Sequence, residues 1–234
     1  MVNYSNALKK PFLNIKNLVI GILLSILPIV RWFAKGYILE NSGLSKNRVP
    51  INKSPKWQDW SDLFVKGLLS SVIAVVYFIP AVLVLLLGTI AIFTSLVVNF
   101  ISTNTFDSII RGETSPNLIQ QMIQQNWVTI LPSLIAILPI LLLSILLGIL
   151  AFYLIPVATL SYISTNDFGQ SFNLSRVFKK AFRSKYFVAW LISLVIILVL
   201  GIALHFIPII GNATSYFIAG IISYSIYGQI YKEI

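Results

Sequence analysis

His205 is the one histidine of this sequence, and it lies in an apolar run without Asp, Glu, Lys or Arg between Lys185 and Lys232. An imidazole inside a membrane titrates near physiological pH, so it is a default candidate for proton transfer or metal binding. Either site would need partners, and the run offers no carboxylate, cysteine or second histidine. We treat His205 as an intramembrane polar candidate, favour a structural role for it, and predict no metal and no cofactor.

Two carboxylates are the remaining candidates for catalysis. Asp59 and Asp62 are three residues apart on an expected helix, but a solvated cap or surface charge explains both. The absence of cysteine excludes disulfides, thiol catalysis and Cys-bound metals. No motif of hydrolases, zinc proteases or phosphate-binding loops occurs. The sequence therefore predicts no catalytic residue and a protein that is not an enzyme.

Basic side chains form the clearest pattern, on an amphipathic helix expected from Phe172 to Tyr186. Apolar residues share one arc at 100° per residue, and the cations share the opposite arc. Such a helix lies in the headgroup plane and faces anionic lipid. We favour the interpretation that these charges set topology and form a solvated face, and keep binding of lipid or of a partner as the alternative. The candidate headgroup ligands are Arg176, Lys179, Lys180 and Arg183.

Aromatic residues recur at three- and four-residue spacing in the stretch from Ser54 to Leu68, which we expect to be a second surface helix. Trp57, Trp60 and Phe64 stand just before an apolar run. Aromatics in that position are typical anchors at the membrane interface. We favour anchoring over ligand contact.

The candidate residues described above lie in or beside long stretches without charged residues, and these stretches must form the elements that position them. Each can cross a ~30 Å hydrocarbon core at least once, which predicts an all-α, polytopic membrane helix bundle in one domain, residues 1–234. Internal prolines predict kinks in the longest spans. A short helix is also expected after Ser115, with Leu118, Ile119, Met122 and Ile123 on one side. The apolar segments are 18–33, 67–101, 129–163, 186–207 and 213–230.

Charge bias predicts the orientation. The connection from Arg31 to Lys66 carries seven basic residues and that from Asp167 to Lys185 carries five, whereas the stretch from Ser102 to Val128 carries only Arg111. By the positive-inside rule the basic connections and the C-terminus face the cytoplasm of a cell membrane. The first segment is short and contains Pro28. We favour a span there, giving five, and leave open a re-entrant segment with four.

The net charge of +10 does not indicate nucleic-acid binding, because the basic residues flank apolar runs instead of covering a soluble face. Partners are expected to be anionic lipids. Small residues at four-residue spacing also allow close helix packing against another span or a second copy. These residues are Ser215, Ala219 and Ser223.

Short motifs along nearly the whole chain resemble a domain-of-unknown-function family of multi-span membrane proteins, found mainly in archaea. The early motifs include Pro55, Trp57, Asp59, Trp60 and Gly67; the later ones include Arg176, Trp190, Pro208, Gly211 and Gly228. The resemblance implies a protein of the cytoplasmic membrane. It brings no catalytic positions.

Three function classes remain. A non-enzymatic membrane scaffold or accessory subunit fits the lack of reactive groups and the flat surface helices. A transporter or permease for a lipid-like or neutral solute fits the many prolines, since broken helices often line transport sites. An enzyme acting on lipid inside the membrane is third. The transporter would need a cavity lined by residues such as Asn99, Ser133, Thr159, His205 and Tyr224.

Overall fold

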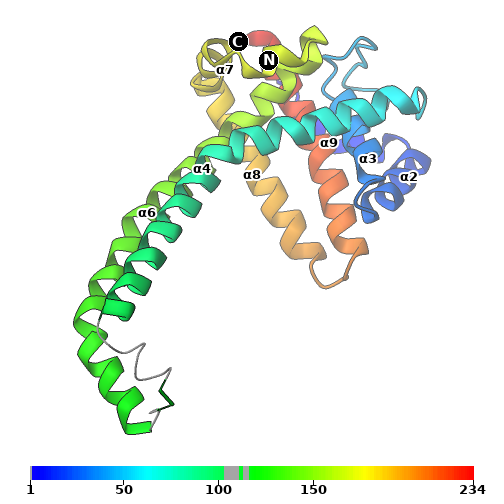
Figure 1. Ribbon diagram of the computed structural model, residues 1–234. Coiled ribbons are helices and arrows are strands. Elements are labelled where there is room, and N and C mark those ends of the chain that lie inside the picture. Colours follow the sequence, from blue (N-terminus) through cyan, green and yellow to red (C-terminus); the bar gives the residue numbers. More distant parts are fainter. Residues whose placement is uncertain (1, 103–110, 113–115) are drawn as a thin grey trace. The chain divides into compact units, whose positions relative to one another are not determined.

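The computed structural model describes residues 2–102, 111–112 and 116–234 (Figure 1). Within these ranges, the side chains of 95–96, 98–102, 116–119, 121–130 and 133–134 lie outside the description. Packing divides the chain into two compact units, one formed by Met1–Tyr77 with Phe152–Ile234 and the other by Phe78–Ala151. We describe each unit by itself, and a single membrane domain stays a prediction.

Helices make up all the regular secondary structure in the described ranges. The first unit contains α1 (Tyr4–Lys9), the 3-10 helix η1 (Lys10–Leu13), α2 (Ile15–Ile26), α3 (Arg31–Glu40), the 3-10 helix η2 (Phe168–Phe172), α7 (Leu174–Ala181), α8 (Ser184–Leu204) and α9 (Ile210–Glu233). Two longer helices, α4 (Trp60–Ser102) and α6 (Pro116–Thr165), contribute to both units.

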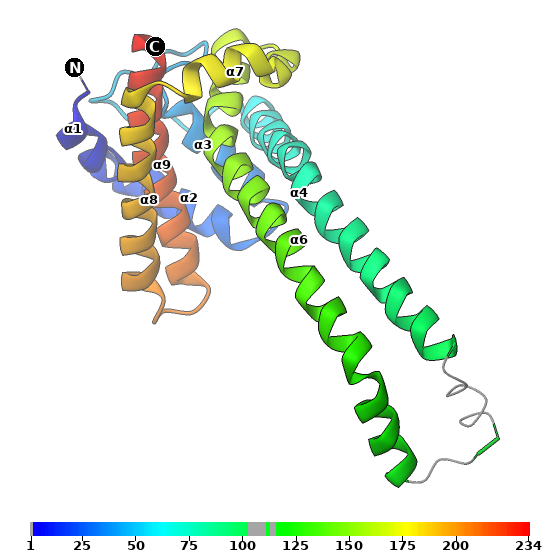
Figure 2. The ribbon, with the colours of Figure 1, turned by 90° about the vertical axis from the view of Figure 1, so that its left-hand side faces the viewer.

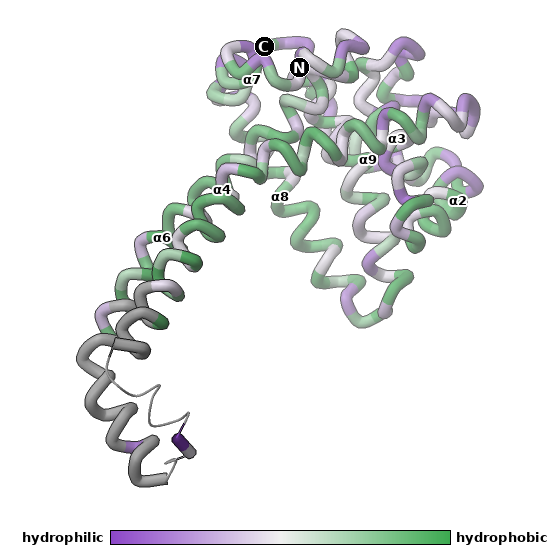
Figure 3. The backbone as a smooth tube through the Cα atoms, in the orientation of Figure 1, coloured by the Kyte–Doolittle hydropathy of each residue, from purple (hydrophilic) through white to green (hydrophobic). Residues whose placement is uncertain are grey.

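Three helices in the described part of the chain are long and apolar enough to cross a membrane. They are Trp60–Thr94, Ile135–Thr165 and Ser184–Leu204. Figure 3 shows hydrophobic residues along α8 and along the described parts of α4 and α6. The all-α fold class with apolar spans is confirmed.

Each of the two longest predicted segments is one helix, as expected. Pro80 lies inside α4. Helix α6 begins at Pro116, the predicted helix start, but it runs without a break to Thr165, so the short helix expected after Ser115 is not a separate element. The apolar face predicted for residues 118–123 lies outside the described side chains. In the second unit α4 and α6 lie side by side, and Ser144 Oγ donates to the carbonyl of Ala81 at 2.9 Å (Figures 1 and 2).

The first apolar segment is broken and does not form one helix over 18–33. Helix α2 ends at Ile26, Leu27 is extended (φ −93°, ψ 132°), and α3 begins at Arg31. Pro28 explains the break, because its ring disfavours helical backbone at the preceding residue and it lacks an N–H. With 12 residues, α2 is about 18 Å long and falls short of the ~30 Å core.

Helix α9 is the centre of the first unit. It runs antiparallel to α8 (Figure 2), and α1, α2 and α3 also pack against it. Phe217, Ile226 and Ile230 are at most 1% exposed. The turn between the helices spans 205–209, slightly earlier than the predicted 208–212. Although α9 is more polar than the three spans, its burial keeps that polarity away from lipid.

The two surface helices differ from their predicted bounds. The expected helix over 172–186 is divided. The side chain of Asn173 accepts from the backbone N–H of Arg176 and starts α7, which ends at Ala181, and α8 begins at Ser184 after the extended backbone of Arg183. The expected helix over 54–68 begins only at Trp60. Asp59 precedes it with a left-handed backbone (φ 53°), which places Trp57 outside the helix.

Candidate functional site

Two glycines bring α3 and α4 into close contact. A Cβ built on Gly36 would lie 1.9 Å from the carbonyl oxygen of Leu63, and one on Gly67 would lie 1.9 Å from that of Trp32. Only glycine fits at each position, so the two backbones touch where the helices cross. About one helical turn beyond this contact, Glu40 of α3 meets Lys66 of α4.

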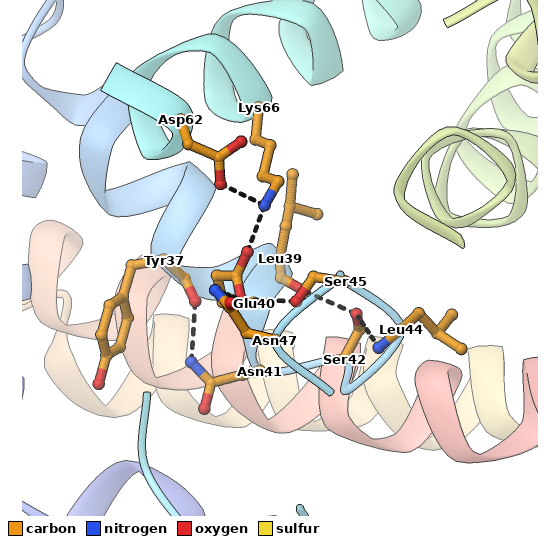
Figure 4. Close-up of polar contacts among 10 residues, drawn as sticks. All are labelled: Tyr37, Leu39, Glu40, Asn41, Ser42, Leu44, Ser45, Asn47, Asp62 and Lys66. Carbon is orange, nitrogen blue, oxygen red and sulfur yellow. Dashed lines mark hydrogen bonds and ion pairs between the residues drawn. The ribbon is translucent and has the colours of Figure 1, made fainter. Parts of the chain in front are cut away.

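Glu40 and Lys66 form a buried ion pair (Figure 4). Lys66 Nζ lies 2.5 Å from Glu40 Oε1, and the two side chains are 4% and 3% exposed. Lys66 also pairs with Asp62, one turn earlier in α4, whose side chain is half-exposed. A buried cation is tolerated only when it is paired and hydrogen-bonded, and the two carboxylates meet that requirement.

The second oxygen of Glu40 holds the loop that follows α3. Oε2 accepts from Ser45 Oγ at 2.6 Å and from Asn47 Nδ2 at 3.3 Å. The start of the loop is fixed as well, because Lys10 Nζ donates to the carbonyl of Asn41 at 2.8 Å. Both oxygens of Glu40 are therefore engaged, which suits a structural carboxylate better than a general base.

A pocket of about 300 Å³ lies between this loop and the start of α4. Glu40, Asp59 and Asp62 contribute acidic groups to its lining, whereas Lys53 and Lys56 contribute basic ones. Both signs of charge therefore surround it, and a small polar or zwitterionic group would fit. Among the described residues, no group of three or more His, Cys, Asp or Glu side chains is placed to hold a metal ion.

The predicted interfacial anchors belong to an aromatic cluster. Trp57 stacks on Tyr37 with ring centroids 4.1 Å apart, and Tyr37 stacks on Phe217 of α9 at 5.7 Å. Trp57 Nε1 also donates to the carbonyl of Asn17 at 3.3 Å. Trp57 thus packs within the first unit. Trp60 is half-exposed, and anchoring in the interface stays a prediction for it.

Phe64, the third predicted anchor, packs against α3. Its ring lies 5.6 Å from that of Trp32, edge to face, and 5.1 Å from that of Phe33. It therefore adds aromatic packing to the contact between α3 and α4.

The predicted headgroup ligands divide into exposed and inward-facing residues. Arg176 and Lys179 are exposed on α7, and Arg183 is exposed in the turn between α7 and α8. Lys180 instead donates to the carbonyl of Tyr231 at 3.1 Å and lies 3.9 Å from the centre of that ring. Burial, and then the charge of Arg176, lower the pKa of Lys180 below its usual value. Three of the four candidates are thus open to a headgroup.

His205 caps the C-terminal end of α8 and is exposed in the turn before α9. Thr159 and Tyr224, two residues of the hypothetical transport cavity, lie beside each other in the first unit. Tyr224 neighbours Tyr227, whose ring lies 5.8 Å from that of Tyr186. His205 follows Tyr186 by 19 residues of α8, or about 28 Å. The side chains of Asn99 and Ser133 lie outside the described residues.

The small residues of α9 are used within the chain. Ser215, Ala219 and Ser223 are 8%, 2% and 3% exposed. A Cβ on Gly201 of α8 would lie 4.0 Å from Ser215 Oγ, so Ser215 faces α8. Of the two predicted uses of these residues, packing against another helix of the same chain fits their burial.

A family model matches most of the chain. The family described as a protein of unknown function (DUF4013) matches residues 19–209. The chain belongs to this family. No curated protein and no solved structure matches the chain. The match covers α3, α4, α7 and α8, and with them the Glu40–Lys66 pair. It confirms the predicted membership of a domain-of-unknown-function family, while the archaeal distribution stays an expectation.

The sequence reading missed the Glu40–Lys66 pair, although one signal was available. Glu40 is the one acidic residue among the first 58, and it ends an apolar stretch, Gly36-Tyr37-Ile38-Leu39. A lone carboxylate there predicts a buried partner. The identity of the partner depends on how α3 and α4 cross.

Proposed function

We propose that this protein is a non-enzymatic membrane scaffold or accessory subunit, which holds a basic and apolar surface against anionic lipid. The observation that carries the proposal is the way α7 buries one face against the first unit and exposes the other. Val177 and Ala181 are fully buried, so the first unit fixes this helix. Leu174 and Phe182 are 54% and 66% exposed, beside the exposed cations. Apolar and basic side chains together are the surface that an anionic membrane interface binds.

The charged network also supports a structural role. Glu40, Lys66 and Lys10 are nearly buried, and their polar atoms join α3, α4 and the loop after α3. These ionisable groups serve to hold the first unit together. The transporter alternative has less support, because Tyr224 lies about 21 Å along α9 from Ile210, the residue at which the turn that contains His205 ends.

For the topology, we propose the re-entrant alternative for the first segment, with crossings by α4, α6, α8 and α9 and both termini in the cytoplasm. The supporting contacts follow α9. Near its C-terminal end, the N–H of Asn3 donates to Gln229 Oε1 at 2.8 Å. Deeper, Arg31 lies over the ring of Tyr216. After α3 the chain lies again beside the C-terminal part of α9, since a Cβ on Gly228 would be 2.0 Å from the carbonyl oxygen of Ser42.

The lipid contact of α7 can be tested with one fluorophore, because the chain contains no cysteine. A dye attached to Ser175→Cys, an exposed position of α7, reports on its surroundings in nanodiscs. We expect a blue shift with phosphatidylglycerol that 1 M salt reverses, since the screening length falls to about 3 Å. Asn212→Cys, exposed at the start of α9, is the control. Equal spectra in anionic and zwitterionic nanodiscs would refute the proposal.

A further inference from the structure

Helix α3 carries two cations on one face. Arg31 and Lys35 are four residues apart, so their side chains are neighbours on the helix surface. Like charges in this arrangement repel each other and destabilise a helix. Within the described part of the chain, no carboxylate forms an ion pair with either residue. The pair therefore concentrates positive charge without a counter-ion.

Neighbouring elements hold both cations in place. Lys35 Nζ donates to Ser71 Oγ of α4 at 3.1 Å. The guanidinium of Arg31 lies 3.7 Å from the centre of the Tyr216 ring in α9. Burial, and then the charge of Arg31, lower the pKa of Lys35 to about 8. Three elements of the first unit thus maintain a cationic pair at an energetic cost.

The surface beside the pair is apolar. Leu27 and Ile29, which precede Arg31, are 56% and 66% exposed. Val75 lies one turn after Ser71 in α4 and is 64% exposed. A soluble anion would need only the charges. A phospholipid also needs a surface for its acyl chain, which these residues supply.

We propose that Arg31 and Lys35 bind the phosphate of an anionic phospholipid, whose acyl chain lies along Leu27, Ile29 and Val75. The phosphate would neutralise both cations, and the planar guanidinium can donate two hydrogen bonds to its oxygens. This site is separate from the exposed surface of α7. It does not depend on the scaffold role.

The test uses the full chain, delipidated in neutral detergent, with dioleoylphosphatidylglycerol as the probe and native mass spectrometry as the readout. Lys35→Gln and Arg31→Gln should each weaken binding of the first lipid about tenfold, the loss expected for a charge-assisted hydrogen bond. Lys16→Gln, which removes an exposed charge from α2, is the matched control and should retain binding. Arg31→Lys should bind with intermediate affinity.

A second measurement separates lipid binding from folding. Lys35→Gln removes a charge that is buried at an energetic cost, so without lipid the melting temperature of this variant should equal or exceed that of the unchanged chain. Phosphatidylglycerol should raise the melting temperature of the unchanged chain and of Lys16→Gln equally, and that of Lys35→Gln by less at the same lipid concentration. The proposal is overturned if Lys16→Gln loses as much binding as Lys35→Gln. It is also overturned if dioleoylphosphatidylcholine binds equally well, or if inorganic phosphate alone gives the same stabilisation.

Discussion

Gly67 of α4 lies against the backbone carbonyl of Trp32 in α3, so closely that a Cβ at this glycine would be 1.9 Å from the oxygen. Since backbone atoms cannot move aside as a side chain can, Gly67→Ala should separate the two helices. We expect a loss of about 1–3 kcal/mol or more in the free energy of unfolding. Denaturant titration of the purified protein measures this loss. Gly201→Ala, where the nearest atom is 4.0 Å away, should be nearly neutral.

Removing one partner of the buried ion pair should destabilise the protein more than removing both. Lys66→Met leaves Glu40 charged and buried, which costs about 3–5 kcal/mol in comparable pairs. Adding Glu40→Gln removes that charge, so the double variant should recover part of the loss. Unfolding free energies of the two single variants and the double variant form the cycle. A double variant as unstable as the sum would show that the two side chains act independently.

Stability should rise with pH above neutrality because of Lys10, and Lys35, whose pKa is also lowered to about 8, contributes in the same direction. Burial, and then the charge of Lys232, lower the pKa of Lys10 to about 8, against a usual value of 10.5. The unfolded chain then binds this proton more tightly than the folded one, so stability increases between about pH 8 and pH 10.5. Burial also raises the pKa of Tyr37, which reverses the trend above about pH 10.

The measurement is therefore the unfolding free energy at pH 7.5 and at pH 9.5. Lys10 should contribute roughly 1–2 kcal/mol to the gain of the unchanged chain, and Lys10→Gln should remove that contribution. Lys9→Gln removes an exposed charge next to it and is the matched control. Identical pH dependence of Lys10→Gln and Lys9→Gln would contradict the assignment to Lys10.

The re-entrant topology predicts which positions share a side of the membrane. Ser5→Cys and Ser175→Cys, both exposed, should react with an impermeant maleimide from the same side, and Asn212→Cys from the opposite side. The chain has no native cysteine, so each variant reports one position. Labelling of Ser5→Cys together with Asn212→Cys would instead support a first segment that crosses the bilayer.

The sequence was sufficient for those elements that local chemistry determines. Runs without charge predicted α4, α6 and α8 as apolar helices, and the prolines of α4 and α6 did not end them. Pro28 could have predicted the break between α2 and α3, because the residue before a proline disfavours helical backbone. The hydrophobicity of the segment favoured one continuous span instead.

Other features could not be read from the sequence because they depend on residues far apart in the chain. Trp57 has the spacing of an interfacial anchor, but it stacks on Tyr37, which in turn stacks on Phe217. Lys180 belongs to the basic arc of its helix, yet its ammonium group donates a hydrogen bond to the carbonyl of Tyr231 in the last turns of α9. In both residues, tertiary packing decides which neighbour an amphipathic side chain contacts.

Helix α9 follows in the chain all the elements that it packs against. During synthesis, α1, α2 and α3 therefore leave the ribosome well before the helix that packs on Ala34 and Ile38 exists. Until then these elements lack their main partner, and their apolar faces must be shielded by lipid, the insertion machinery or a chaperone. Assembly of the first unit is thus a late event joining distant parts of the chain, and a ribosome stalled before residue 210 would carry a unit that cannot close.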